Sequence, residues 1–113
     1  MMQKTGGSSN MQSAVATHTA SASESSFTTV AATLPGGAVG IPKVLHCSGS
    51  VGGLVQIQFG SQAVRTIAVA PNQLPVDIQV PPSAFPNKVG SVNVQFEAFG
   101  AGTLVGVVDF AVG

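Results

Sequence analysis

Residues 91–112, SVNVQFEAFGAGTLVGVVDFAV, contain the pattern that decides the fold. Apolar and polar side chains alternate from Ser91 to Phe99, and β-branched residues are frequent from Thr103 to Val112. A repeat of two residues is typical of a strand with one buried face. The break Gly100-Ala101-Gly102 between the two runs is short and rich in glycine, so it predicts a β-hairpin with a three-residue loop.

The register of this hairpin predicts part of the core. It sets Val94 opposite Val108 and Phe96 opposite Gly106, so the inward side chains of both strands meet on one face. The residues that we expect to be buried together are Val92, Val94, Phe96, Val108 and Phe110.

The last strand is apolar on its other side as well. There it presents Val105, Val107 and Ala111, with Asp109 as its only charge. A strand that is apolar on both sides is normally covered on both sides. We therefore expect these three residues to form a subunit interface. The alternative is a strand in the middle of the sandwich with the N-terminal segment folded over it.

From Phe27 onward, short apolar and β-branched runs are separated by glycine and proline clusters, which is typical of all-β domains. The sequence predicts an antiparallel β-sandwich or jelly roll of seven or eight strands. The run from Val76 to Val80 has proline at both ends, so it belongs at a sheet edge or where the chain changes sheet. The expected strands are Phe27 to Leu34, Lys43 to Ser50, Leu54 to Phe59, Ala63 to Ala70, Val76 to Val80, Ser91 to Phe99 and Thr103 to Val112, with Ala38 to Ile41 as a possible eighth.

Residues 1–26 are expected to form a polar N-terminal arm, and residues 27–113 the sandwich domain. The stretch from Thr17 to Ser26 is of low complexity and consists mostly of small side chains. Such a segment buries too little surface to offset its ordering entropy, so alone it should be disordered. We expect the arm to extend over a neighbouring subunit; the alternative is an arm that packs along its own domain.

Charged residues make up 7% of the chain, against about 25% in an ordinary soluble domain, and the net charge is zero. The four basic residues are too few and too scattered to neutralise nucleic-acid phosphates, so no nucleic acid is expected as a partner. No apolar run is long enough to span a membrane, and no secretory signal opens the chain. We expect synthesis in a cytoplasm and no contact with a membrane.

No residues are expected to carry catalysis, a metal or a cofactor, so the chain is predicted not to be an enzyme. His46 and Cys47 are adjacent in a strand and therefore point to opposite faces, which excludes a thiolate–imidazole pair. Cys47 should be a small buried hydrophobe. His18 lies in the arm, and His46 has no acid expected nearby, so no metal-ligand set is formed. The carboxylates expected to be solvated surface charges are Glu24, Asp77, Glu97 and Asp109.

A surface of Gln, Ser, Thr, Asn and apolar side chains without net charge suits a subunit that packs against copies of itself or a lattice. In this general character the chain resembles the decoration or cement proteins of tailed bacteriophage capsids, which often form trimers. The resemblance implies a homo-oligomeric virion protein, with a trimer favoured, that clamps the major capsid protein or another virion lattice and performs no catalysis. The alternative is a receptor- or ligand-binding sandwich module of a viral fibre or adhesin, although Tyr and Trp, which dominate contact hot spots, are absent.

Overall fold

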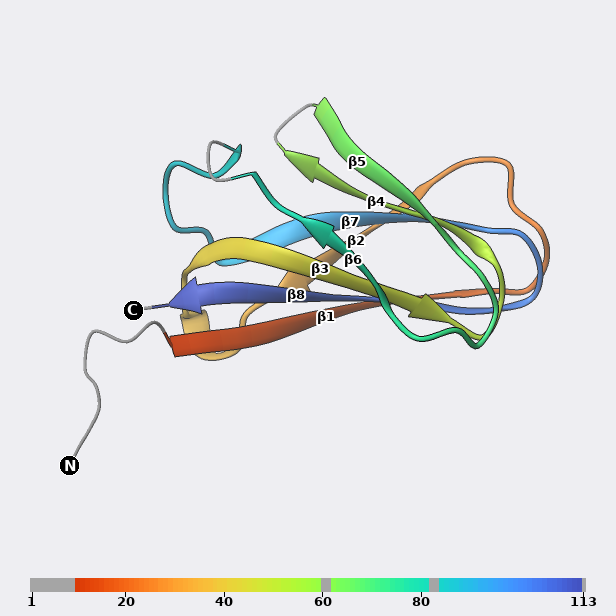
Figure 1. Ribbon diagram of the computed structural model, residues 1–113, viewed down its shortest axis with the longest axis horizontal. Helices are drawn as coiled ribbons and strands as arrows, with labels where there is room; N and C mark the ends of the chain where they lie inside the picture. The colour runs from red at the N-terminus through yellow and green to blue at the C-terminus, as the bar shows by residue number, and fades with distance from the viewer. Residues whose placement is uncertain (1–9, 60–61, 82–83, 113) are drawn as a thin grey trace.

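The computed structural model describes residues 10–59, 62–81 and 84–112 of the 113-residue chain. This part is all-β and contains two antiparallel sheets of four strands each (Figure 1). Sheet A has the order β1-β8-β3-β6, and sheet B the order β2-β7-β4-β5. The strands are β1 (Asn10–Ala20), β2 (Thr28–Thr33), β3 (Ile41–Gly49), β4 (Gly53–Phe59), β5 (Gln62–Val69), β6 (Val76–Gln79), β7 (Ser91–Ala98) and β8 (Gly102–Val112), and a 3-10 turn lies at Pro35–Gly37.

The seven strands predicted from the sequence are confirmed within two residues at each end. The short run with proline at both ends is β6, and it lies at the edge of sheet A, as predicted. The possible eighth strand at Ala38 to Ile41 is wrong, because Gly40 makes only an isolated bridge with Val89 and β3 begins at Ile41. The eighth strand is β1.

Strand β1 corrects the expected arm over residues 10–20. It pairs antiparallel with β8 along its whole length, from Asn10 opposite Val112 to Ala20 opposite Gly102. Its inward side chains include the buried Ala14, Ala16 and Ala20. The segment is small and polar, but the ladder to β8 satisfies the backbone groups on one side of the strand, and alanine suffices on its inner side because larger side chains fill the core. The expected boundary at residue 26 therefore does not hold, and residues 1–9 lie outside the described residues.

The predicted hairpin at residues 91–112 is also corrected. Strand β7 lies in sheet B between β2 and β4, whereas β8 lies in sheet A between β1 and β3. The three residues between them carry the chain from one sheet to the other. At this crossing the chain packs closely, since a Cβ on Gly102 would lie 2.7 Å from the Cβ of Val51.

The core lies between the two sheets, and this arrangement is consistent with the predicted sandwich. All five residues expected to be buried together, from Val92 to Phe110, are buried. They meet across the interior, where a Cβ on Gly106 would come within 3.5 Å of the Phe96 ring. The alternating pattern was thus read correctly, but it does not distinguish strands paired in one sheet from strands that face each other across two sheets.

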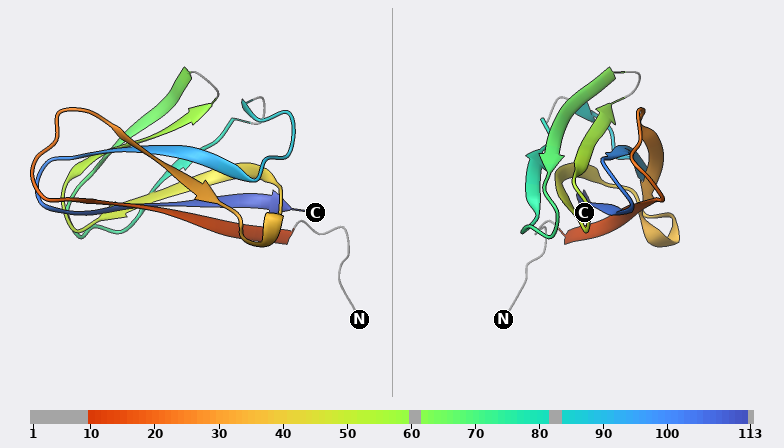
Figure 2. Two further views of the ribbon diagram at one scale, coloured as in Figure 1. Left: turned by 180° about the vertical axis from the view of Figure 1, so that it is seen from behind. Right: turned by 90° about the vertical axis from the view of Figure 1, so that its right-hand side faces the viewer.

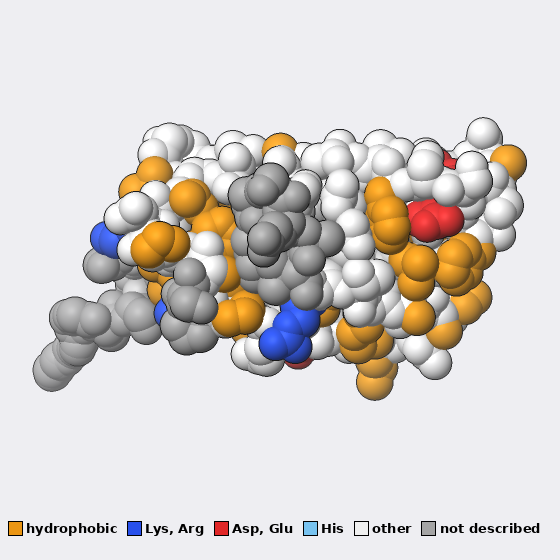
Figure 3. Space-filling model, turned by 90° about the horizontal axis from the view of Figure 1, so that it is seen from above, with side chains coloured by type: hydrophobic (Ala, Val, Ile, Leu, Met, Phe, Trp, Pro, Cys, Tyr) orange, Lys and Arg blue, Asp and Glu red, His pale blue; other side chains and the backbone are white. Residues whose placement is uncertain are grey.

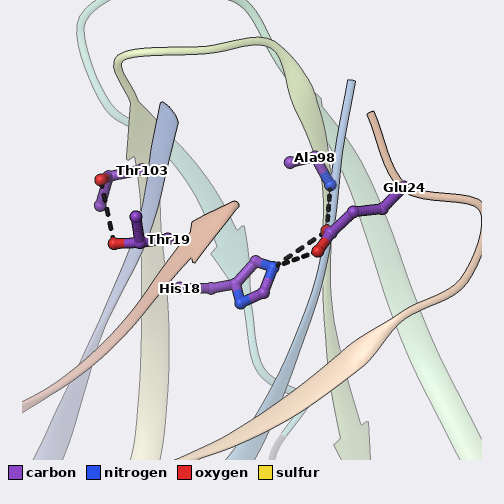
Figure 4. A network of polar contacts seen from close by, with 5 residues as sticks. All are labelled: His18, Thr19, Glu24, Ala98 and Thr103. Carbon is purple, nitrogen blue, oxygen red and sulfur yellow. Dashed lines mark hydrogen bonds and ion pairs between the residues drawn. The ribbon is translucent and has the colours of Figure 1, made fainter. Parts of the chain in front are cut away.

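One end of the molecule is closed by the connection between β1 and β2, which lies beside the turn between β7 and β8 (Figure 2). The Glu24 N–H donates to the Ala98 carbonyl at 2.8 Å, and the Ala98 N–H donates to the Glu24 carboxylate at 2.9 Å. The same carboxylate lies 2.9 Å from His18 Nε2, as Figure 4 shows. The His18 ring stacks on Phe96 with a centroid distance of 5.9 Å. These contacts fasten β1, at the edge of sheet A, and the connection that follows it to β7, an inner strand of sheet B.

Candidate functional site

The outer face of sheet A carries apolar side chains from two neighbouring strands. Val105, Val107 and Ala111 of β8 share this face and are partly exposed, as the sequence placed them. Strand β1 adds Val15 opposite Val107 and Met11 opposite Ala111, and these side chains are 56% and 51% exposed. We call these five residues the apolar patch.

The patch continues onto the third strand of sheet A. Ile41 of β3 lies opposite Ala111, and Val44 lies opposite Asp109; both side chains are partly exposed. Met11 and Val15 were missed at the sequence level because residues 1–26 were read as an arm. The signal that could have revealed them is alanine at every second position, Ala14 and Ala16, with the β-branched Val15 and Thr17 between and after them, since β-branched residues favour strands.

A row of polar side chains crosses the same face, with one residue from each strand. The Ser13 hydroxyl donates to Asp109 Oδ1 at 2.6 Å, and Asp109 Oδ2 lies 2.7 Å from His46 Nε2. On its other side, His46 Nδ1 lies 2.6 Å from Asp77 Oδ1. We call Ser13, Asp109, His46 and Asp77 the polar row.

The polar row favours a protonated histidine. Only the imidazolium carries hydrogen on both ring nitrogens, so only the charged form donates to both carboxylates at once. The hydrogen bond to Asp109 raises the pKa of His46, partial desolvation opposes this, and Asp77 raises it further. Desolvation raises the pKa of Asp109, but the hydrogen bonds from Ser13 and His46 outweigh it, so the net shift is downward. When His46 is protonated, the row places one positive charge between two carboxylates.

The geometry of the polar row does not suit nucleophilic catalysis. The Ser13 hydroxyl donates to a carboxylate and not to His46, so no base is placed to take its proton during an attack. The two carboxylates contact ring nitrogens that point away from each other, and no three His, Cys, Asp or Glu side chains among the described residues are arranged to hold a metal ion. The row instead links four strands through charge-assisted hydrogen bonds.

The sequence-based expectation that His46 has no acid nearby is wrong. In the structure Asp109 lies opposite Ser13 and Val44, while Asp77 lies directly opposite His46. No local pattern indicates that β3 runs between β6 and β8, because this adjacency joins segments far apart in the chain.

His46 and Cys47 point to opposite faces, as predicted. The Cys47 side chain is fully buried, and desolvation, aided by the charge of Asp77, raises the pKa of its thiol to about 12. A thiol with this pKa is almost entirely protonated at neutral pH, so it is a poor nucleophile.

The outer face of sheet B differs in character, because it is polar and mostly uncharged. The Thr66 hydroxyl donates to Gln56 at 2.7 Å, and the Gln56 amide donates to Gln95 at 2.6 Å. The Gln95 amide in turn donates to Thr29 at 3.2 Å. This row again takes one residue from each of its four strands, but its side chains suit contact with water. Charged side chains are sparse in the surface view of Figure 3.

Comparison with family models, with curated proteins and with solved structures finds no match to this chain. No helix among the described residues is long and apolar enough to cross a membrane. The outer face of sheet A, with its apolar patch and polar row, is the candidate functional surface.

Proposed function

We propose that the protein is a non-catalytic structural subunit whose outer sheet A face packs against copies of itself in a larger lattice. The observation that carries this proposal is the apolar patch, in which five apolar side chains from two neighbouring strands are exposed or partly exposed together. Apolar side chains gathered on one outer face in this way mark an interaction site more often than scattered single ones do. The low charge content and zero net charge add support, since free monomers are usually kept soluble by abundant charge.

The contrast between the two outer faces indicates which one is covered. The side chains of sheet B that face outward form a hydrogen-bonded row of amides and hydroxyls, whereas those of sheet A include Val15 and Val107 side by side. Covering sheet A would remove apolar surface from water at about 25 cal/mol per Å². Covering sheet B would mainly remove water from polar groups, with little gain.

The size of the face favours assembly through several contacts. Four strands about 4.8 Å apart, with about eight residues each at a rise of about 3.3 Å, give a flat area of about 500 Å² per copy. Two copies would then bury about 1,000 Å² in total, at the low end of specific interfaces. A subunit held at one such contact binds weakly, but several contacts around a ring or on a lattice bind strongly.

These properties agree with a β-sandwich protein that decorates and stabilises a virion lattice, as capsid decoration or cement proteins do. In this proposal the chain forms a homo-oligomer, with a trimer favoured, and attaches to the major capsid protein or another virion lattice. Mass spectrometry of purified virions tests the location: the proposal expects peptides of this chain in a fixed ratio to the major capsid protein. Absence of the chain from virions would contradict it.

The packing surface is tested by placing a charge on it. Val105 lies between Thr17 and Ser48, with no charged side chain directly opposite, so Val105→Glu should prevent packing of sheet A without disturbing the polar row. The matched control is Asn93→Glu on the outer face of sheet B. Native mass spectrometry should show that the first variant is folded and forms a smaller oligomer than wild type, whereas the second retains the wild-type oligomer. Equal oligomers in both variants would contradict the proposed surface.

A further inference from the structure

We propose that the free edge of β1 pairs with β1 of a second copy, so that two A sheets join into one continuous antiparallel sheet of eight strands. This contact uses the backbone of the strand, and it is separate from packing of the outer face. It extends the proposed function, but it does not depend on it.

Strand β1 is a long and regular edge. It occupies the border of sheet A and appears in red beside β8 in Figure 1. Its 11 residues, NMQSAVATHTA, include no proline and no Asp, Glu, Lys or Arg. The register to β8 is unbroken over all 11 pairs, so no bulge turns the edge away from a neighbour.

The other three sheet edges each carry a feature that hinders strand pairing. Strand β6 has four residues, carries Asp77 and lies between Pro75 and Pro81. Strand β5 carries the exposed Arg65, and its register to β4 shifts near that residue. Strand β2 is short, with six residues. Among the four edge strands that the structure describes, β1 is the only one without a proline beside it, a charged residue, a register shift or a short length.

The backbone of β1 has N–H and C=O groups on the side that faces away from β8. An edge strand bonds its neighbour through alternate residues, and the remaining N–H and C=O groups point outward. Apart from the ladder to β8, no backbone hydrogen bond joins residues 10–20 to the rest of the described chain. No described strand pairs with this side of β1.

A second copy suits this edge because the strand is compatible with itself. Val15 is the midpoint of Asn10–Ala20, and an antiparallel pair centred there sets Val15 opposite its own copy and Met11 opposite Thr19. The two side chains of each pair lie on the same face of the sheet. Because the strand carries no Asp, Glu, Lys or Arg, no like charges meet, and Val15 faces the Val15 of the second copy. The pairing is a closed two-fold contact, the commonest form of dimer. It also makes the apolar patches of both copies continuous.

Cysteine cross-linking tests the pairing directly. Residues that face each other in an antiparallel pair have Cα atoms about 4.5–5.5 Å apart, which is within the range that a disulfide bridges. Cys47 gives little background, because it is buried and its thiol has a pKa of about 12. Full-length Val15→Cys, treated with the oxidant diamide, should form a covalent dimer rapidly. The matched control is Ala31→Cys, an exposed position on the outer face of edge strand β2, which should not cross-link.

The register and the independence of the two surfaces are tested with four further proteins. A mixture of Met11→Cys and Thr19→Cys should give a mixed dimer, whereas each variant alone should not. Val15→Cys should still cross-link when combined with Val105→Glu, because the edge does not need the outer face. Failure of Val15→Cys to cross-link, or equal cross-linking by Ala31→Cys, overturns the proposal. Cross-linking by Val107→Cys but not by Val15→Cys would overturn the edge pairing and leave the packing of sheet A standing.

Discussion

At the residue scale, His46 is a side chain whose protonation depends on two neighbouring carboxylates. It lies between the carboxylates of Asp77 and Asp109, on the face that carries the apolar patch. Its proton neutralises one of two negative charges that would otherwise stand beside exposed apolar side chains. The charge of this face therefore depends on pH, although the polar row does not perform catalysis.

The shifted pKa values predict how stability depends on pH. The pKa of His46 is raised above 6.5 in the folded chain, so its contribution is full below about pH 6.5 and is lost as pH rises through the folded pKa. The pKa of Asp109 is lowered, so its contribution is present above about pH 3.8 and is lost as pH falls through the folded value. Denaturation of wild type and His46→Asn should show a stability difference that shrinks between pH 6 and pH 9. An NMR titration that places the pKa of His46 at or below 6.5 would contradict this prediction.

The Phe96 side chain is fully buried between the sheets, whereas the nearby Phe99 is 54% exposed. Phe96→Ala should reduce the free energy of unfolding by about 3–5 kcal/mol, because it removes a large buried ring and leaves a cavity. Phe99→Ala should cost less than about 1 kcal/mol, as most surface substitutions do. Reversible urea denaturation measures both values. A loss below about 1 kcal/mol for Phe96→Ala would show that the core is wrongly placed.

At the element scale, the sequence predicts where strands lie better than it predicts which strands are neighbours. The two-residue repeat located seven strands because alternation is a local property of the chain. Whether β7 pairs with β8 or faces it across the core depends on the other strands available to each, and that is not a local property. The polar row was missed for this reason, since its four residues come from strands that the chain brings together only through long-range pairing. Three residues of the apolar patch could be assigned to one outward face from the sequence, because they lie on one strand. They are Val105, Val107 and Ala111.

Strand β1 offers a test of whether residues 10–20 belong to the folded body. Ala16 is buried and faces the core, whereas its neighbour Thr17 is exposed on the outer face. Ala16→Asp should reduce the free energy of unfolding by about 3–5 kcal/mol, because it buries an unpaired charge. Thr17→Asp should change it by less than about 1 kcal/mol. Chemical denaturation compares the two variants, and a detached arm would leave both as stable as wild type.

At the scale of the whole molecule, the two outer faces differ in the side chains that they expose. Sheet B presents amides and hydroxyls that bond to one another, and sheet A presents the apolar patch beside an edge strand without protection. Because the chain has few charged side chains and no net charge, electrostatic repulsion between copies is weak. The central claim is therefore that this protein functions as an assembled subunit.

The most direct test is the native mass of the full-length wild-type chain, measured by sedimentation from micromolar to near-millimolar concentration. The chain has a mass of 11.2 kDa, so assembly predicts a species at a whole multiple of that mass, whose share of the protein rises with concentration. A particle of 11.2 kDa throughout that range would contradict the claim that sheet A and its edge are surfaces for packing between copies.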